Sequence, residues 1–73
     1  MFEKKLLGER IRILRTEKNT SQDKLGELLG VTRSQISDLE RGRTTTSLER
    51  LWLLADYFEV TTDYLIGRSD IRS

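Results

Sequence analysis

Residues 22–41 read QDKLGELLGVTRSQISDLER, and this stretch decides the fold of the chain. Leucines at helical spacing run as far as Leu29, and Gly30 then interrupts the pattern. A second helical register opens at Thr32, so only a short break separates the two helices. Helices joined by so short a break cannot lie antiparallel and must cross at a steep angle. The stretch therefore predicts a helix-turn-helix, the motif that places the exposed side of its second helix in the major groove of DNA.

Local signals support this prediction. Ser21 can cap the first of the two helices, and Thr32 forms a capping box with Gln35 at the start of the second. Gly30 suits a sharp turn that favours a positive φ. Gly26 costs about 1 kcal/mol compared with Ala inside a helix, which is reasonable where two helices approach closely. The alternative interpretation is an ordinary pair of short helices in a small bundle.

The composition is typical of one small globular domain. The chain has 73 residues, of which 36% are hydrophobic and 34% are charged. It has no cysteine, which excludes disulfides, and no histidine, which removes the commonest catalytic base and metal ligand. We therefore expect no metal, no cofactor and no enzymatic activity. No apolar run approaches the roughly 18 residues of a membrane span, and no signal peptide is visible, so we expect a cytoplasmic protein without membrane contact.

Charge is distributed unevenly along the chain. The formal net charge is only +1. Residues 1–43 contain ten basic and seven acidic groups, whereas residues 44–73 contain three basic and five acidic ones. The more basic half holds the helix-turn-helix, as binding to nucleic acid requires.

We predict an all-α fold, a compact five-helix bundle with the helix-turn-helix at helices two and three. The predicted helices cover residues 4–18, 22–29, 33–41, a segment opened by a capping box at 46–49, and 62–66. The core stripe of the fourth helix consists of Leu48, Leu51, Leu54, Ala55 and Phe58. We expect residues 1–67 to form the DNA-binding domain and residues 68–73 to be a flexible tail or the start of a linker.

Four segments of the chain carry a family resemblance: LGERIRILR, SQDKLGELLGVTRSQISDLERGR, SLERLWLLADYF and VTTDYLIG. Through them the chain resembles the Cro/repressor family of phage and bacterial regulators, also called the xenobiotic-response-element type. The resemblance runs from about Leu7 to Gly67 and implies a DNA-binding fold of the phage-repressor type. The sequence departs from the family pattern at two positions. Thr46 stands where the family usually has proline, and Gly26 stands where it usually has alanine.

The outward side of the second helix of the motif is the expected reading surface. Because helical residues are spaced by 100°, four side chains face outward together, namely Arg33, Ser34, Ser37 and Asp38. The resemblance implies that these positions meet base edges. The planar guanidinium of Arg33 fits the O6 and N7 acceptors of guanine, or it is a solvated group at a helix start. Asp38 could accept from a cytosine amino group or repel phosphates at wrong sites.

Phosphate contacts are expected on either side of that surface. The resemblance implies that Gln22 bonds a phosphate and braces the first residue of the next helix. Gln35 has a competing use as the capping partner of Thr32, so it is a structural or phosphate-side group. Arg41 and Arg43 follow the reading helix and should lie along the DNA backbone, where contacts position the protein without reading sequence. The alternative for both arginines is ordinary surface charge.

Two further sets of residues are assigned structural roles. The resemblance implies an ion pair of Arg15 with Glu40 that joins the first helix to the end of the third. In the fourth helix, Leu53 and Tyr57 lie one turn apart outside the core stripe. We expect a two-fold dimer interface at Leu53, Tyr57, Tyr64 and Ile66. The alternatives are that single exposed apolar residues are normal, or that a further C-terminal domain covers them.

The sequence thus predicts a transcriptional regulator that binds double-stranded DNA in a sequence-specific way, most often a repressor. It would bind a palindromic operator as a homodimer, with half-sites about 10 bp apart. The first alternative is the antitoxin of a toxin–antitoxin pair, which binds a protein toxin and also regulates its own operon. The second is a protein-interaction module with no DNA role, whose weak DNA binding would depend little on salt.

Overall fold

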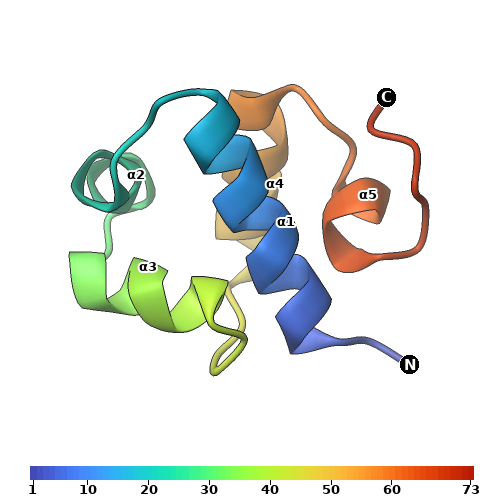
Figure 1. Cartoon of the computed structure of the whole chain (residues 1–73), viewed down its shortest axis with the longest axis horizontal. Helices are drawn as coiled ribbons and strands as arrows, with labels where there is room; N and C mark the ends of the chain where they lie inside the picture. The colour runs from blue at the N-terminus through green and yellow to red at the C-terminus, as the bar shows by residue number, and fades with distance from the viewer.

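Five helices and no strand make up the computed structural model, which describes all 73 residues (Figure 1). Their bounds are α1 Lys4–Glu17, α2 Gln22–Leu29, α3 Arg33–Glu40, α4 Leu48–Phe58 and α5 Thr62–Ile66. The predicted all-α fold is confirmed, and the predicted bounds of α1, α2, α3 and α5 hold within one residue.

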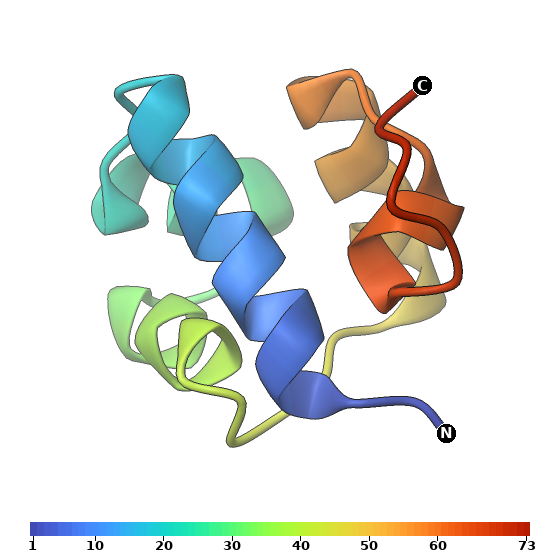
Figure 2. The same cartoon turned by 45° about the vertical axis from the view of Figure 1, so that its right-hand side comes forward.

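The first helix organises the bundle. Figure 2 shows α1 running between α2 and α3 on one side and α4 and α5 on the other, and it contacts α3, α4 and α5. Twelve buried side chains form a single core, and the five that are most completely covered come from all five helices: Ile11, Leu25, Ile36, Leu54 and Leu65. Because this core takes one side of every helix, each outer side is free to carry function. None of the helices is both long and apolar enough to cross a membrane.

Hydroxyl side chains fix where four of the helices begin. Ser21, Thr32, Ser47 and Thr61 each accept a hydrogen bond from the backbone N–H three residues on. At Thr32 the predicted capping box is complete, because the Gln35 side chain also accepts from the Thr32 N–H at 2.8 Å. Gly30 ends α2 in the left-handed conformation, with φ 72°, and turns the chain into α3.

The predicted capping box at residues 46–49 is wrong. Ser47, and not Thr46, caps α4, and its hydroxyl accepts from the Arg50 N–H at 3.2 Å. The position three residues after the cap is therefore Arg50, whose side chain cannot act as the reciprocal acceptor that Glu49 was expected to be. Leu48 becomes the first helical residue and is 81% exposed, so it does not belong to the core stripe. The other members of that stripe are buried or pack against the core.

A glycine that no sequence pattern indicated permits a close crossing of α1 and the end of α3. Gly8 of α1 is buried, and a Cβ there would overlap the carbonyl oxygen of Leu39 and lie 2.7 Å from that of Glu40. At Gly26 a Cβ would lie 2.7 Å from the carbonyl oxygen of Val31, which agrees with the close approach inferred there. The two glycines let α1 and α2 pack directly against backbone at the two ends of α3.

The last residues fold back along α1. The guanidinium of Arg10 donates to the carbonyl oxygens of Tyr64 and Ser69 and to the Asp70 carboxylate, and it stacks 4.1 Å from the centre of the Tyr64 ring. Arg72 pairs with Glu17 at 2.9 Å, and its hydrogen bond is the main reason that the pKa of the Glu17 carboxyl lies below its usual range. We call these contacts the tail clasp. The tail was predicted to be flexible, and that flexibility stays a prediction.

Candidate nucleic-acid interface

The helix-turn-helix presents one side of α3 outward. Ile36 and Leu39 fix the inner side, since both are buried in the core. On the opposite side Arg33 and Ser34 are exposed, whereas Ser37 and Asp38 are partly exposed. The four residues predicted to face outward therefore lie together on the surface. Hydroxyl and charged side chains on the outer side of a short helix can form hydrogen bonds with the donors and acceptors of a long polar molecule such as a nucleic acid.

The starts of α2 and α3 meet at a polar hollow. This hollow has a volume of about 320 Å³ and is lined by Arg15, Ser21, Gln22, Asp23 and Arg33. It brings Gln22 and Arg33 together, although they come from different helices. Both helices direct their N-terminal N–H groups and positive dipole ends to this region, which favours an anion. Asp23 opposes that preference with its own negative charge.

Beneath the hollow, Glu40 is fully hydrogen-bonded. The Arg15 guanidinium donates to both of its oxygens, at 2.6 and 3.2 Å, and Gln22 donates to one of them at 3.1 Å. Arg15 also donates to the carbonyl oxygen of Thr20 at 2.8 Å. The Glu40 side chain is only 3% exposed, so the expected ion pair is a buried one. The hydrogen bond from Gln22, which no sequence pattern predicted, ties the start of α2 to the end of α3.

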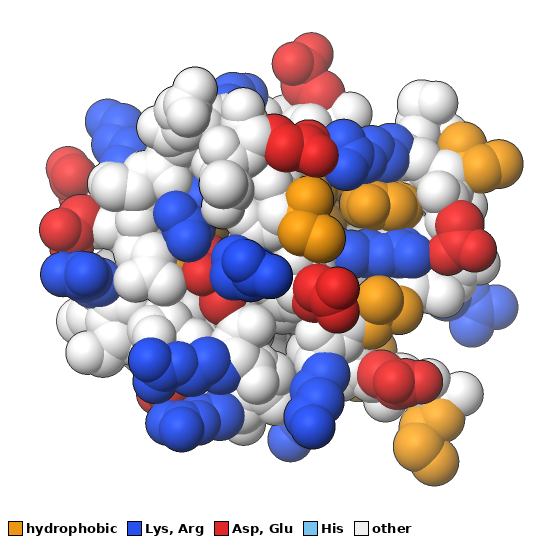
Figure 3. All heavy atoms as spheres, viewed as in Figure 1, with side chains coloured by type: hydrophobic (Ala, Val, Ile, Leu, Met, Phe, Trp, Pro, Cys, Tyr) orange, Lys and Arg blue, Asp and Glu red, His pale blue; other side chains and the backbone are white.

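The other predicted phosphate-side residues keep free donors. Gln35 uses its side-chain oxygen to accept from Thr32, which leaves its amide nitrogen available on an exposed residue. Arg41 and Arg43 are exposed just after α3. Arg43 lies 3.6 Å from the Asp38 carboxylate, so an exposed ion pair connects the loop after α3 to the outer side of the helix. In Figure 3 basic side chains gather at the lower left, over α3 and the loop that follows it.

The four residues predicted to form a dimer interface do not make one patch. Leu53 is 46% exposed, as expected. Tyr57 is partly buried, with its hydroxyl 2.7 Å from that of Thr20 and Lys18 stacked on its ring. Ile66 is partly buried in α5. Tyr64 is buried in the core, because α5 turns its ring inward under Arg10, so its place in a surface patch is corrected.

The outer side of α4 carries a different apolar surface. Leu48 and Trp52 lie one turn apart and are 81% and 69% exposed, and together with Leu53 they line a shallow hollow. A second hollow, which shares Leu53, extends this surface to Leu28 on α2. We call Leu48, Trp52 and Leu53 the α4 face. Leu48 and Trp52 are four residues apart, and this spacing could have indicated a shared apolar side of the helix. Because Leu48 was predicted to lie in the core, no role was predicted for Trp52.

Comparison with known proteins agrees with this arrangement. A model of the helix-turn-helix family matches residues 11–65. The transcriptional regulator AnsR of Bacillus subtilis is 42% identical over 60 residues, which cover 82% of this chain and 52% of that protein. This chain spans 52%, 31% and 56% of the length of three curated relatives that it matches.

Two solved structures have nearly the same fold. The P22 c2 repressor in complex with a synthetic operator superposes with a TM-score of 0.80 at 36% identity, over 88% of this chain and 97% of that one. The restriction-modification controller protein C.AhdI from Aeromonas hydrophila superposes with a TM-score of 0.73 at 35% identity, over 85% of this chain and 90% of that one.

Proposed function

This chain belongs to the helix-turn-helix family, as its resemblance to the Cro/repressor type predicted, and we propose that it regulates transcription by binding double-stranded DNA at a specific sequence. The observation that carries the proposal is the outer side of α3, where a buried inner side holds four polar residues outward beside a cluster of exposed basic groups. The likeness to a repressor crystallised with operator DNA supports it. Repression is the simplest outcome, since a protein bound at an operator blocks the polymerase.

The outer residues divide into two roles. Arg33, Ser34, Ser37 and Asp38 contact base edges in the major groove, with Arg33 on a guanine. Gln22, Gln35, Arg41 and Arg43 contact phosphates and set the orientation of α3. Asp38 also lies 3.6 Å from Arg43, so the proposed base-reading and phosphate-binding groups adjoin at this exposed ion pair.

A second copy of the chain completes the proposed complex. The α4 face is exposed and apolar, and an isologous contact would place each copy of it against its own counterpart. So small a patch supports only weak pairing of the free domain, and pairing would strengthen on an operator that holds two copies side by side. The target would therefore be a two-fold symmetric sequence with half-sites about 10 bp apart.

Selection from a pool of random duplexes tests the proposal directly. After several rounds we expect enrichment of a palindromic sequence, and a gel shift on that sequence should show two copies bound. Transcription from a promoter carrying the sequence should fall when the protein is added. A pool without enrichment, or binding that is insensitive to salt, would contradict a sequence-specific DNA-binding function.

A further inference from the structure

The first turn of α1 lies directly against the loop that follows α3. Gly42, in that loop, has φ +76°, and a Cβ there would lie 2.8 Å from both the Cα and the Cγ of Lys5. Only a glycine fits this contact without displacing one of the two segments. The close approach fixes Lys5 beside Gly42, and the chain neighbours of Gly42 are the two basic residues Arg41 and Arg43.

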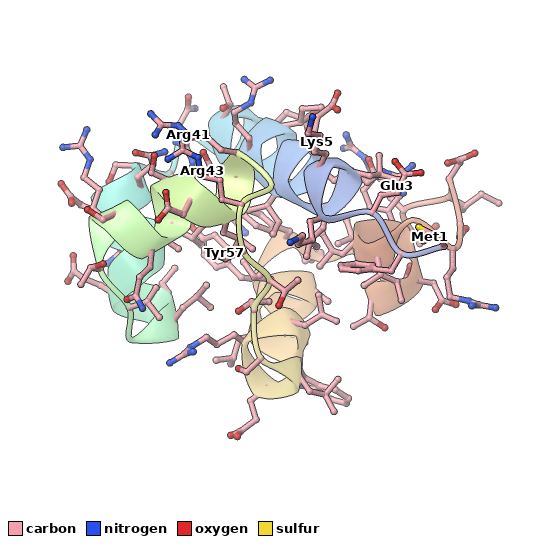
Figure 4. All side chains as sticks on the ribbon, turned by 90° about the horizontal axis from the view of Figure 1, so that it is seen from below. Met1, Glu3, Lys5, Arg41, Arg43 and Tyr57 are labelled. Carbon is pink, nitrogen blue, oxygen red and sulfur yellow. The ribbon has the colours of Figure 1, made fainter.

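These three basic residues form one exposed group, which we call the basic strip. Lys5, Arg41 and Arg43 are all exposed. Figure 4 shows their side chains along the same edge of the molecule, although they come from α1 and from the end of α3. Arg43 shares its charge with Asp38, but Lys5 forms no ion pair with any residue of the chain.

Like charges held close by backbone packing repel one another, and a bound anion relieves that repulsion. Flexible surface lysines normally separate from other cations at little cost. Here the close approach of Gly42 keeps the Lys5 backbone beside the loop, so the side chain can move but its point of attachment stays next to the two arginines. The basic strip continues the proposed phosphate side of α3 toward the N-terminus of α1. A polyanion that runs along α3 would pass over it.

We propose that Lys5 binds a DNA backbone phosphate, so that the first turn of α1 is part of the DNA interface. This inference rests on the proposed function and extends it, because α1 has no part in the helix-turn-helix. Lys5 contributes affinity and orientation without reading sequence. Gly42 acts as the positioning residue, because it keeps the α1 and α3 portions of the basic strip together.

The salt dependence of DNA binding tests this role without knowledge of the operator. Filter-binding titrations of a 24-bp duplex of mixed sequence, repeated over a range of KCl concentrations, give the slope of log K against log [KCl]. Loss of one phosphate contact lowers the magnitude of that slope by about 0.9. We expect Lys5→Gln to show this change, with an affinity about tenfold lower near 0.1 M salt.

Arg68→Gln is the matched control, because Arg68 is exposed in the tail and its substitution removes the same charge. It should leave the slope unchanged. Gly42→Ala should lower the slope as Lys5→Gln does, since a side chain there forces the loop away from α1. Thermal melting of Lys5→Gln should match the parent, because the Lys5 ammonium has no partner in the fold.

The outcomes separate the two proposals. If the parent binds in a salt-dependent way and Lys5→Gln keeps the parental slope, the role of Lys5 is overturned while the proposed function stands. Equal changes in Lys5→Gln and Arg68→Gln would also overturn it, because they would reflect net charge alone. A parent without salt-dependent binding overturns the proposed function and this inference together.

Discussion

The outer sides of α3 and α4 are built in the same way and differ in chemistry. Each helix begins at a hydroxyl cap and buries its inner side in the shared core. The outer side of α3 is polar and charged, whereas the α4 face consists of two leucines and a tryptophan. Polar groups that stay solvated can exchange water for base edges and phosphates, but exposed indole and leucine side chains gain only by meeting another apolar surface. In the proposed function the outer side of α3 meets nucleic acid, and the α4 face meets a second copy of the chain.

The inner sides of α3 and α4 also differ, and the largest effect of a substitution is expected there. A buried ion pair holds the end of α3, whereas the first turn of α4 is tied to the bundle by a hydrogen bond from Arg50 to the carbonyl oxygen of Leu29. Glu40→Ala leaves the largely buried Arg15 guanidinium without its carboxylate partner and should lower the free energy of unfolding by about 3 kcal/mol or more. Urea unfolding followed by circular dichroism measures this. Glu49→Ala, on the exposed start of α4, is the control and should change stability by no more than about 0.5 kcal/mol.

Removing the charged group at the start of α3 should affect DNA recognition and leave the fold intact. Arg33→Ala should weaken binding to the selected operator by about 1–3 kcal/mol and relax the preference at one base position. Arg43→Ala should weaken binding to operator and random DNA about equally. Competition titrations with single-base operator variants distinguish the two patterns. An unchanged base preference in Arg33→Ala would mean that α3 lies in the groove in another register.

The matching change on α4 should affect pairing and leave base preference intact. The double substitution Leu48→Lys with Trp52→Lys should cost about 1–2 kcal/mol of cooperative binding. Gel-shift titrations on a full operator and on a half-site measure it, and their ratio cancels the effect of the added charges. The full site should lose affinity relative to the half-site. If the ratio of full-site to half-site affinity stays the same, the α4 face is not part of the dimer interface. The proposed division of roles between α3 and α4 would then be wrong.

The smallest effect is expected at the tail clasp, which lies on neither outer side. Arg72→Gln removes the partner that lowers the Glu17 pKa, so its small stabilisation is lost. Because that pKa is lowered in the folded state, the stabilisation is present above the usual glutamate pKa and disappears as the pH falls through the lowered value. The difference in urea midpoint between parent and variant should therefore shrink on acidification. Operator binding and pairing at neutral pH should not change.

Sequence patterns were sufficient for α3 because its signals are local. The Thr32–Gln35 capping box and the spacing of Ile36 and Leu39 lie within eight residues, and they fix both the helix start and the outward side. The start of α4 was misassigned because Thr46 and Ser47 are consecutive residues that can both cap a helix. In the folded chain Ser47 is the cap, and Leu48 is an exposed first residue of the helix.

The remaining surprises depend on residues that are distant in the sequence. Nothing near Gly8 indicates a close crossing, because the backbone it meets belongs to Leu39 and Glu40. Likewise, the hydrogen bond from Gln22 to Glu40 forms only when α2 and α3 are packed against each other. The sequence around Tyr64 does not indicate that its ring is buried, because the ring is covered by Arg10 from the distant helix α1. Such contacts are set by the folded topology, so a single sequence carries no direct signal for them.

The exposure of Trp52 has an optical consequence. It is the only tryptophan of the chain, so the indole emission comes from one known position on α4. In water that emission should lie at long wavelength and be quenched readily by iodide. Covering the α4 face should shift the emission toward the blue and protect the indole from the quencher. The unmodified protein therefore carries its own spectroscopic reporter of what its α4 side meets, and it needs no attached dye.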